Sequence, residues 1–209
     1  MNIKNNLGHS ADISLTAELS IPINGNNIID FKKLARLYKD ELLDNVLPFW
    51  LEHSQDNEYG GYFTCLDRDG RVFDTDKFIW LQGREVWMFS MLYNKVEKRQ
   101  EWLDCAILGG EFLKKYGHNG NYNWYFSLDR SGRPLVEPYN IFSYTFATMA
   151  FGQLSLATGS QEYADIAKKT FDIILSKVDN PKGKWNKLHP GTRNLKNFAL
   201  PMILCNLAM

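Results

Sequence analysis

The sequence has no excess of charge of either sign and no long apolar run. Lysine plus arginine number 24, and aspartate plus glutamate also number 24. This balance gives no electrostatic footprint for nucleic acid or for an anionic membrane surface. No apolar run approaches the length of about 20 residues that spans a bilayer. We therefore expect neither nucleic acid nor a membrane as a partner.

Cysteine is scarce, and its three copies are far apart in the sequence: Cys65, Cys105 and Cys205. They form no C-x-x-C pair, which is the spacing that zinc sites and redox motifs use. Reduced thiols are typical of cytosolic proteins. The cysteines therefore predict a cytoplasmic protein without a zinc site, and we expect no metal among the site residues.

Residues 1–27 are polar and lack the continuous apolar stretch of a signal peptide. We predict that they form a disordered N-terminal extension. The length of 209 residues suits one domain, or at most two small ones. The folded part is therefore expected to cover residues 28–209.

Apolar residues recur every three or four positions in several segments, which is the period of an amphipathic helix. Pro48 should kink or restart the last turn of the first helix. The aromatic content of 14% fits a helix–helix core first and a sugar-stacking surface second. The expected helices cover residues 28–52, 78–94, 100–116, 139–157 and 162–178, and a last one begins near Asn197.

The second of these helices places an arginine among aromatic residues. Spacings of four, three and four put four residues on one face: Trp80, Arg84, Trp87 and Met91. Burying an unpaired charge costs several kcal/mol. Arg84 therefore either pairs with a carboxylate or faces an electron-rich ligand. The candidate carboxylates are Asp76, Glu85 and Glu137.

An internal repeat relates YFTCLDRDGRVF at 62–73 to YFSLDRSGRPL at 125–135. Each residue of the L-D-R-x-G-R motif at 66–71 recurs 62 positions later, at 128–133. Both copies read as hairpin turns that the Asp and Arg side chains tie together. The repeating unit is an outer amphipathic helix, a long loop with a hairpin, and a more apolar inner helix.

About three helix pairs of this kind account for the folded part. Such pairs cannot bury both faces alone, so they must stack as a solenoid or close into a ring. The expected fold class is therefore all-α with short β-hairpins in the loops. The last helix lacks a Gly or polar stop signal before Met209. We interpret the chain as half of a ring, truncated at its C-terminus.

Three motifs carry a resemblance to a known family: F-W-L-x-H-S-x-D-x-E-x-G-G-x-F-T-C-L, W-L-Q-G-R-x-V-W-M and E-P-Y-N-I-F-S. From about Leu34 onward the chain resembles the N-acylglucosamine 2-epimerase family, also known as renin-binding proteins. The resemblance implies an (α/α)6 toroid of twelve helices, of which this chain would hold the N-terminal half. It also implies a homodimer with ATP or a related nucleotide as an effector. The resemblance implies chemistry that requires no cofactor, and the sequence contains no phosphate-binding G-x-x-x-x-G-K-[ST] loop.

The implied reaction interconverts N-acetylglucosamine and N-acetylmannosamine by removing and returning the C2 proton of the open-chain sugar. Such chemistry needs two acid/base groups beside C2 and a cation near the carbonyl oxygen. Arg84 matches the family arginine with the second role, and it is the catalytic candidate. The expected substrate-binding residues are Trp80, Gln82, Tyr139, Asn140 and Ser143. Asn140 could equally cap the following helix.

The acid/base histidines that the resemblance implies belong to the second half of the ring. Surface or loop-packing roles suit the four histidines of this chain better: His9, His53, His118 and His189. The chain alone is therefore expected to be inactive, and whether it is an enzyme stays open.

Three alternatives remain open. The first is a related sugar isomerase or epimerase of the cellobiose 2-epimerase or mannose isomerase type. The second is a glycoside hydrolase or lyase, which needs two carboxylates in the inner helices. The expected inner helices contain Glu85 but no convincing second carboxylate. The third is a non-catalytic, renin-binding-like interaction protein.

Overall fold

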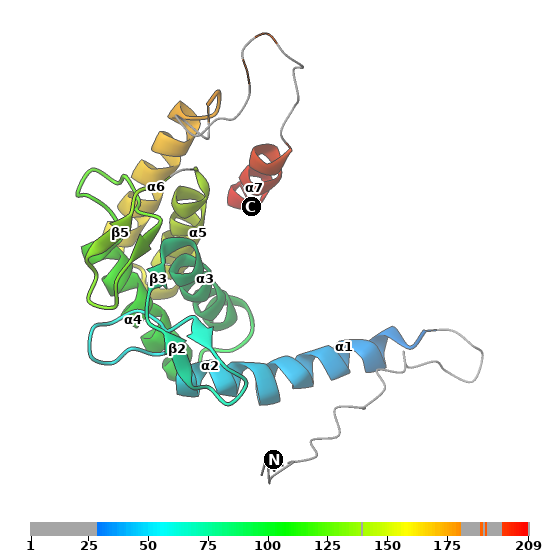
Figure 1. Ribbon diagram of the computed structural model, residues 1–209. Helices are drawn as coiled ribbons and strands as arrows, with labels where there is room; N and C mark the ends of the chain where they lie inside the picture. Colours follow the sequence, from blue (N-terminus) through cyan, green and yellow to red (C-terminus); the bar gives the residue numbers. More distant parts are fainter. Residues whose placement is uncertain (1–28, 139, 181–188, 190, 192–197, 209) are drawn as a thin grey trace, which may run out of the picture. The chain divides into compact units, whose positions relative to one another are not determined.

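The computed structural model describes residues 29–138, 140–180, 189, 191 and 198–208 (Figure 1). The chain forms two compact units, residues 1–46 and residues 47–209. Described residues of the first unit form α1 (Phe31–Asp40) and a π-helix (Glu41–Val46). Asp30 caps α1, because its carboxylate accepts a hydrogen bond from the Lys33 N–H at 3.0 Å. The proposed boundary after residue 27 stays a prediction.

The second unit begins with α2 (Leu47–His53), in which Pro48 is the second residue. The single helix predicted over 28–52 is therefore helical nearly throughout but changes type at the π-helix. Proline has no N–H to donate to the carbonyl four residues earlier, and this local loss favours an irregular turn before it. The expectation that the helix restarts near Pro48 is confirmed.

Four longer helices make the body of the second unit: α3 (Ile79–Lys95), α4 (Gln100–Tyr116), α5 (Phe142–Thr158) and α6 (Gln161–Ser176). A short helix, α7 (Ala199–Leu207), contacts α5. The α3 and α5 helices pack on each other, with α4 against α3 and α6 against α5 (Figure 1). Predicted and observed helix limits differ by at most three residues for these four helices.

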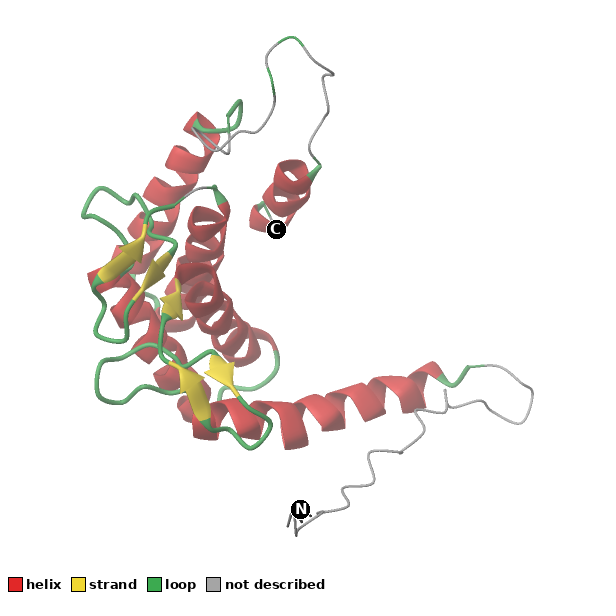
Figure 2. Ribbon diagram, in the orientation of Figure 1, coloured by secondary structure: helices red, strands yellow, loops and turns green. Residues whose placement is uncertain are grey.

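Short strands lie in the loops between the helices (Figure 2). The first hairpin pairs β1 (Cys65–Leu66) with β2 (Val72–Asp74). A three-stranded antiparallel sheet contains β3 (Lys77–Phe78), β4 (Ser127–Leu128) and β5 (Pro134–Val136), in that order. The fold is therefore mainly helical with small hairpins, as predicted. The pairing of β3 with β4, which joins the two repeats, was not predicted.

The two copies of L-D-R-x-G-R form the same turn. Asp67 accepts hydrogen bonds from the backbone N–H and the Nε of Arg71, both at 2.8 Å. Asp129 accepts the same two bonds from Arg133, at 2.9 and 2.6 Å. Gly70 and Gly132 have φ of +79° and +94°, which glycine adopts without strain. The prediction that these Asp and Arg side chains tie the turns together is confirmed.

Buried aromatic residues at equivalent repeat positions tie each loop to the next outer helix. Tyr62 is fully buried, and its hydroxyl donates to the Cys105 carbonyl of α4 at 2.7 Å. Trp124, 62 positions later, is also fully buried, and its Nε1 donates to Thr170 Oγ1 of α6 at 3.1 Å. In each loop, a buried aromatic ring whose polar group is hydrogen-bonded anchors the loop to the following outer helix.

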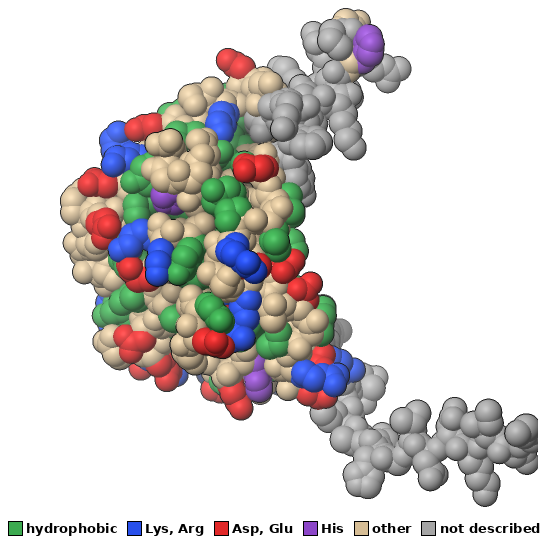
Figure 3. Space-filling view, turned by 60° about the vertical axis from the view of Figure 1, so that its left-hand side comes forward, with side chains coloured by type: hydrophobic (Ala, Val, Ile, Leu, Met, Phe, Trp, Pro, Cys, Tyr) green, Lys and Arg blue, Asp and Glu red, His purple; other side chains and the backbone are tan. Residues whose placement is uncertain are grey.

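The surface mixes charges of both signs. On the face that Figure 3 shows, Lys and Arg side chains are interspersed with Asp and Glu, with hydrophobic side chains between them. No helix among the described residues is long and apolar enough to cross a membrane.

Candidate functional site

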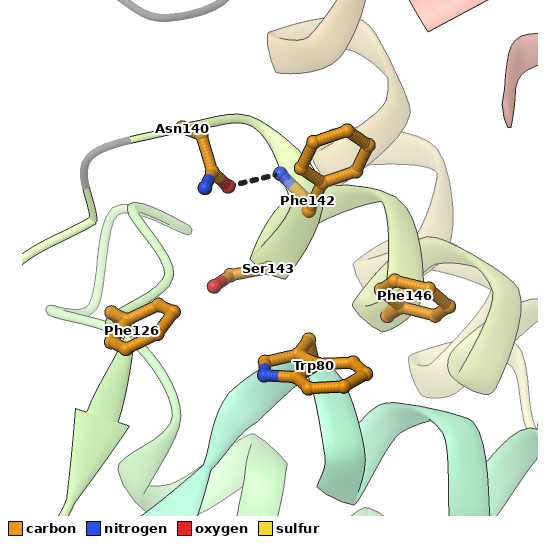
Figure 4. A pocket seen from close by; sticks show the side chains of 6 residues that line it. All are labelled: Trp80, Phe126, Asn140, Phe142, Ser143 and Phe146. Carbon is orange, nitrogen blue, oxygen red and sulfur yellow. Dashed lines mark hydrogen bonds between the residues drawn. The ribbon is translucent and has the colours of Figure 1, made fainter. Parts of the chain in front are cut away.

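A pocket of about 320 Å³ opens beside the first turns of α3 and α5. Four aromatic residues and two polar residues line it: Trp80, Phe126, Phe142, Phe146, Asn140 and Ser143. Figure 4 shows these side chains around a common opening, with Trp80 from α3 facing residues from the start of α5. Mostly apolar walls with a few convergent polar groups are typical of small-molecule sites.

Three polar groups at the pocket have no hydrogen-bond partner among the described residues: Ser143 Oγ, Asn140 Nδ2 and Trp80 Nε1. The other end of the Asn140 amide is occupied, because its Oδ1 accepts the Phe142 N–H at 2.9 Å. Asn140 precedes Ile141, the N-cap residue of α5, and its side chain satisfies the first N–H of the helix while its own NH2 group stays available. Both roles left open for this residue by the sequence are compatible with its geometry.

Arg84 lies next to the pocket without lining it. Its guanidinium carbon is 5.8 Å from the centre of the Trp80 ring and 5.5 Å from that of Phe146. The side chain is exposed, so its charge stays solvated. None of the three candidate carboxylates forms an ion pair with Arg84, nor does any other residue in the described ranges. The guanidinium rests on two aromatic rings instead.

Gly83 allows α3 and α5 to approach closely at this point. A Cβ added to Gly83 would lie 2.9 Å from the backbone carbon and oxygen of Phe146. Real Cβ atoms essentially never approach another heavy atom this closely. The glycine of W-L-Q-G-R therefore brings the Trp80 and Phe146 rings to 6.0 Å between centres. This close approach builds the aromatic side of the pocket.

Gln82 lies on the opposite, buried face of α3. It has no exposed surface, and its amide forms two hydrogen bonds with the Tyr62 backbone, both 2.8 Å long. With its amide occupied and no access to the pocket, Gln82 holds the loop before β1 onto α3. We therefore replace the expected substrate contact by this structural role.

Glu85 is buried on the same face as Gln82, at 7% exposure. The Ser54 hydroxyl lies 2.6 Å from the Trp50 carbonyl and 2.5 Å from Glu85 Oε1. A hydroxyl has one proton, so both bonds form only if Glu85 is a neutral acid that donates to Ser54. Burial agrees with this assignment, because it raises the pKa of Glu85 to about 8. Glu85 therefore belongs to the core, and none of the described residues that line the pocket is the carboxylate that the hydrolase alternative needs.

The described histidines do not line the pocket. His53 ends α2, and His189 is exposed. His118 stacks on Tyr122 and packs edge-on against Trp124, and burial lowers its pKa. His9 and the predicted site residue Tyr139 lie outside the described residues. Within those residues, no group of three or more His, Cys, Asp or Glu could hold a metal ion.

Three pocket residues were not expected from the sequence. Phe142 and Phe146 lie on the first two turns of α5, and Phe151 lies further along the same helix. Phe151 is fully buried, whereas the other two are half-buried and face the pocket. Phe126 was not singled out at all. Its position directly before the strand that carries the second L-D-R motif is the signal that could have marked it.

Comparison with known proteins places residues 61–209 in a match to the family model described as N-acylglucosamine 2-epimerase (GlcNAc 2-epimerase). The N-acylglucosamine 2-epimerase of Bos taurus is 43% identical over 184 residues, which are 84% of this chain and 44% of that protein. The cellobiose 2-epimerase of Dictyoglomus turgidum is 28% identical over 167 residues, or 76% of this chain and 42% of that protein. This chain thus spans less than half the length of each relative.

Among solved structures, the cellobiose 2-epimerase from Bacillus thermoamylovorans B4167 matches with a TM-score of 0.64 and 28% identity. The match covers 69% of this chain and 37% of that structure. The likeness confirms the predicted fold class, the (α/α)6 toroid.

Proposed function

Because the chain belongs to the N-acylglucosamine 2-epimerase family, we propose that it forms one wall of an amino-sugar epimerase site. The reaction would interconvert N-acetylglucosamine and N-acetylmannosamine through proton exchange at C2. The supporting observation is that Trp80, Asn140 and Ser143 line one pocket with Arg84 beside it. These residues come from two repeats of the chain.

Each residue has a distinct part in this proposal. The Trp80 ring offers a face for the apolar side of a sugar. Ser143 Oγ and Asn140 Nδ2 bind sugar hydroxyl or amide groups, since no described residue occupies them. Removing the C2 proton places negative charge on the carbonyl oxygen, and the guanidinium of Arg84 stabilises that charge. An exposed, unpaired arginine can turn toward a ligand without breaking an ion pair.

Proton transfer requires acid/base groups on both sides of C2. No described histidine faces Arg84 across the pocket, and Glu85 lies on the other face of α3. We therefore propose that this chain by itself binds the amino sugar but does not sustain turnover. A homodimer and an ATP effector remain predictions from family membership.

A matched pair of tryptophan variants tests the site. Trp80 and Trp87 are both half-buried on one face of α3, but only Trp80 lines the pocket. Titration of the purified chain with N-acetylmannosamine in a calorimeter should show binding that Trp80→Ala abolishes and Trp87→Ala preserves. Equal loss in both variants, or no binding by the unmodified chain, would contradict the proposal.

Two further measurements separate the neighbouring functions. Cellobiose and mannose serve as competing ligands, because cellobiose 2-epimerases match this chain at 28–30% identity. Tighter binding of either sugar than of N-acetylmannosamine would favour the cellobiose 2-epimerase type. Sustained formation of N-acetylglucosamine from N-acetylmannosamine would overturn the statement that the chain lacks the bases.

A further inference from the structure

Asp56 is a buried acceptor on which two cations from distant parts of the sequence converge. Its side chain is 1% exposed. Oδ2 accepts from Lys77 Nζ and from Arg130 Nε, both at 2.9 Å, and Oδ1 accepts from Arg130 Nη2 at 3.0 Å. Although burial opposes its ionisation, the hydrogen bonds from Arg130 and Lys77 lower the pKa of Asp56 to about 2. We call Asp56, Lys77 and Arg130 the Asp56 clamp.

Lys77 is held in one orientation within the clamp. It is 0% exposed, and its ammonium has three protons to donate. They go to Asp56 Oδ2 at 2.9 Å, the Gly60 carbonyl at 2.6 Å and the Arg130 carbonyl at 2.9 Å. The ammonium also lies 4.4 Å from the centre of the Phe112 ring. A buried charge with every donor occupied has no freedom to move without losing a bond.

The clamp connects directly to both sides of the pocket. Lys77 is on β3, three residues before Trp80, and Arg130 follows β4, four residues after Phe126. Lys77 pairs with Leu128 across the two strands, and the Ile79 N–H donates to the Phe126 carbonyl at 3.0 Å. The Phe78 and Phe126 rings meet edge-to-face at 5.6 Å. Fixing β3 against β4 therefore fixes Trp80 relative to Phe126.

The first hairpin shows that the turn forms without an ion pair at the position of Arg130. Arg68 stands at the position equivalent to Arg130, 62 residues earlier, in a turn with the same Asp–Arg hydrogen bonds. Arg68 is exposed and has no ion pair within the described residues. The two arginines thus share their local sequence and differ in whether they reach a buried carboxylate.

We propose that the Asp56 clamp is a set of positioning residues that fixes the Trp80 and Phe126 walls of the pocket. The identity of the ligand rests on the proposed amino-sugar function, but the positioning role does not. Displacing one wall by even a fraction of an ångström weakens a site built on stacking and short polar contacts.

The test uses the full chain labelled with 5-fluorotryptophan and observed by ¹⁹F NMR. The Trp80 resonance is assigned by its absence from Trp80→Phe. Arg130→Gln should displace or split the Trp80 resonance, and Arg68→Gln should leave it in place. Arg130→Lys keeps the charge but loses the bidentate contact with Asp56, so it should displace the Trp80 resonance less than Arg130→Gln does. It also carries the comparison if Arg130→Gln does not fold.

A purely structural role for Arg130 would lower the melting temperature without moving the Trp80 resonance in the folded state. That result, or an equal displacement in Arg68→Gln, would overturn the proposal. Titration of the same samples with N-acetylmannosamine keeps the two hypotheses apart. If the sugar leaves the Trp80 resonance of the unmodified chain unchanged, the proposed function fails. The positioning role still stands or falls on the Arg130 variants.

Discussion

The two faces of α3 use polar side chains in opposite ways. On the buried face, Gln82 and Glu85 have hydrogen-bond partners within the fold, at the Tyr62 backbone and at Ser54. On the other face, Trp80 Nε1 and the Arg84 guanidinium have neither a hydrogen bond nor an ion pair to a described residue. The same helix therefore carries polar groups with partners in the core and polar groups at the pocket that bond to no described residue.

This difference separates residues that hold the fold from residues available for binding. A buried polar group without a partner costs stability, so partnered groups on the inner face are structural. A solvated polar group without a protein partner costs little and can meet a ligand. Substitutions on the two faces should therefore change the free energy of unfolding by different amounts, with the largest change at the buried face.

Gln82→Leu should break the buried face most severely. The substitution leaves the N–H and the carbonyl of Tyr62 unpaired in the core, which should lower the free energy of unfolding by roughly 3–5 kcal/mol. Urea unfolding followed by circular dichroism measures the change. Gln100→Leu, at an exposed position of α4, is the control and should stay within about 0.5 kcal/mol. Equal stability of the two variants would mean that Gln82 is not structural.

Glu85→Gln should stabilise the chain at alkaline pH. The pKa of Glu85 is raised from its ordinary 4.5 to about 8, so the folded state keeps a proton that the unfolded state releases. The favourable contribution of the neutral acid is fully present below pH 4.5 and is lost as the pH rises to about 8. The glutamine variant is neutral throughout and can still donate to Ser54. At pH 8 it should be more stable by about 4 kcal/mol.

The same glutamine variant supplies its own control. At pH 4 the wild-type side chain is mostly neutral in both states, so the two proteins should unfold at similar urea concentrations. A stability difference that does not depend on pH would show that Glu85 is ionised in the folded chain. The assignment from the Ser54 proton count would then be wrong.

Asn140 combines a structural bond, to the Phe142 N–H, with an Nδ2 donor available for binding. Its variants should change the free energy of unfolding least. Asn140→Ala removes the bond to the Phe142 N–H and should cost about 1 kcal/mol in unfolding experiments. Asn140→Asp keeps an acceptor for that N–H but loses the Nδ2 donor. It should retain stability while binding N-acetylmannosamine more weakly. If Asn140→Asp binds as the unmodified chain does, the Nδ2 group does not contact the ligand.

Much of the architecture follows from local sequence. The α4 helix lies at its predicted residues, 100–116, and the two L-D-R-x-G-R turns form as expected. Helical periodicity and Asp–Arg turn chemistry act between residues a few positions apart, so a single sequence displays them. Strands of two residues carry no such period. The pairing of β3 with β4 therefore gave no readable signal.

The sequence predicted only part of the candidate site. Trp80, Asn140 and Ser143 line the pocket, and Arg84 lies beside it, whereas Gln82 faces the core. Gln82 and Arg84 are separated by one residue, which turns them about 200° apart on a helix. The W-L-Q-G-R motif therefore cannot place both side chains in one pocket. Phe126 was missed because it reaches the site through strand pairing.

The sequence by itself determined the helices, the repeated hairpins and the family, because each depends on residue type and on spacing along the chain. Only the tertiary structure decided which polar residues have hydrogen-bond or ion-pair partners within the fold. Gln82 finds its partner 20 positions away, and Arg130 finds Asp56 at a separation of 74 positions. A hydrogen bond or ion pair depends on distances of about 3 Å between atoms. Residues so far apart reach those distances only when the helices and strands between them pack.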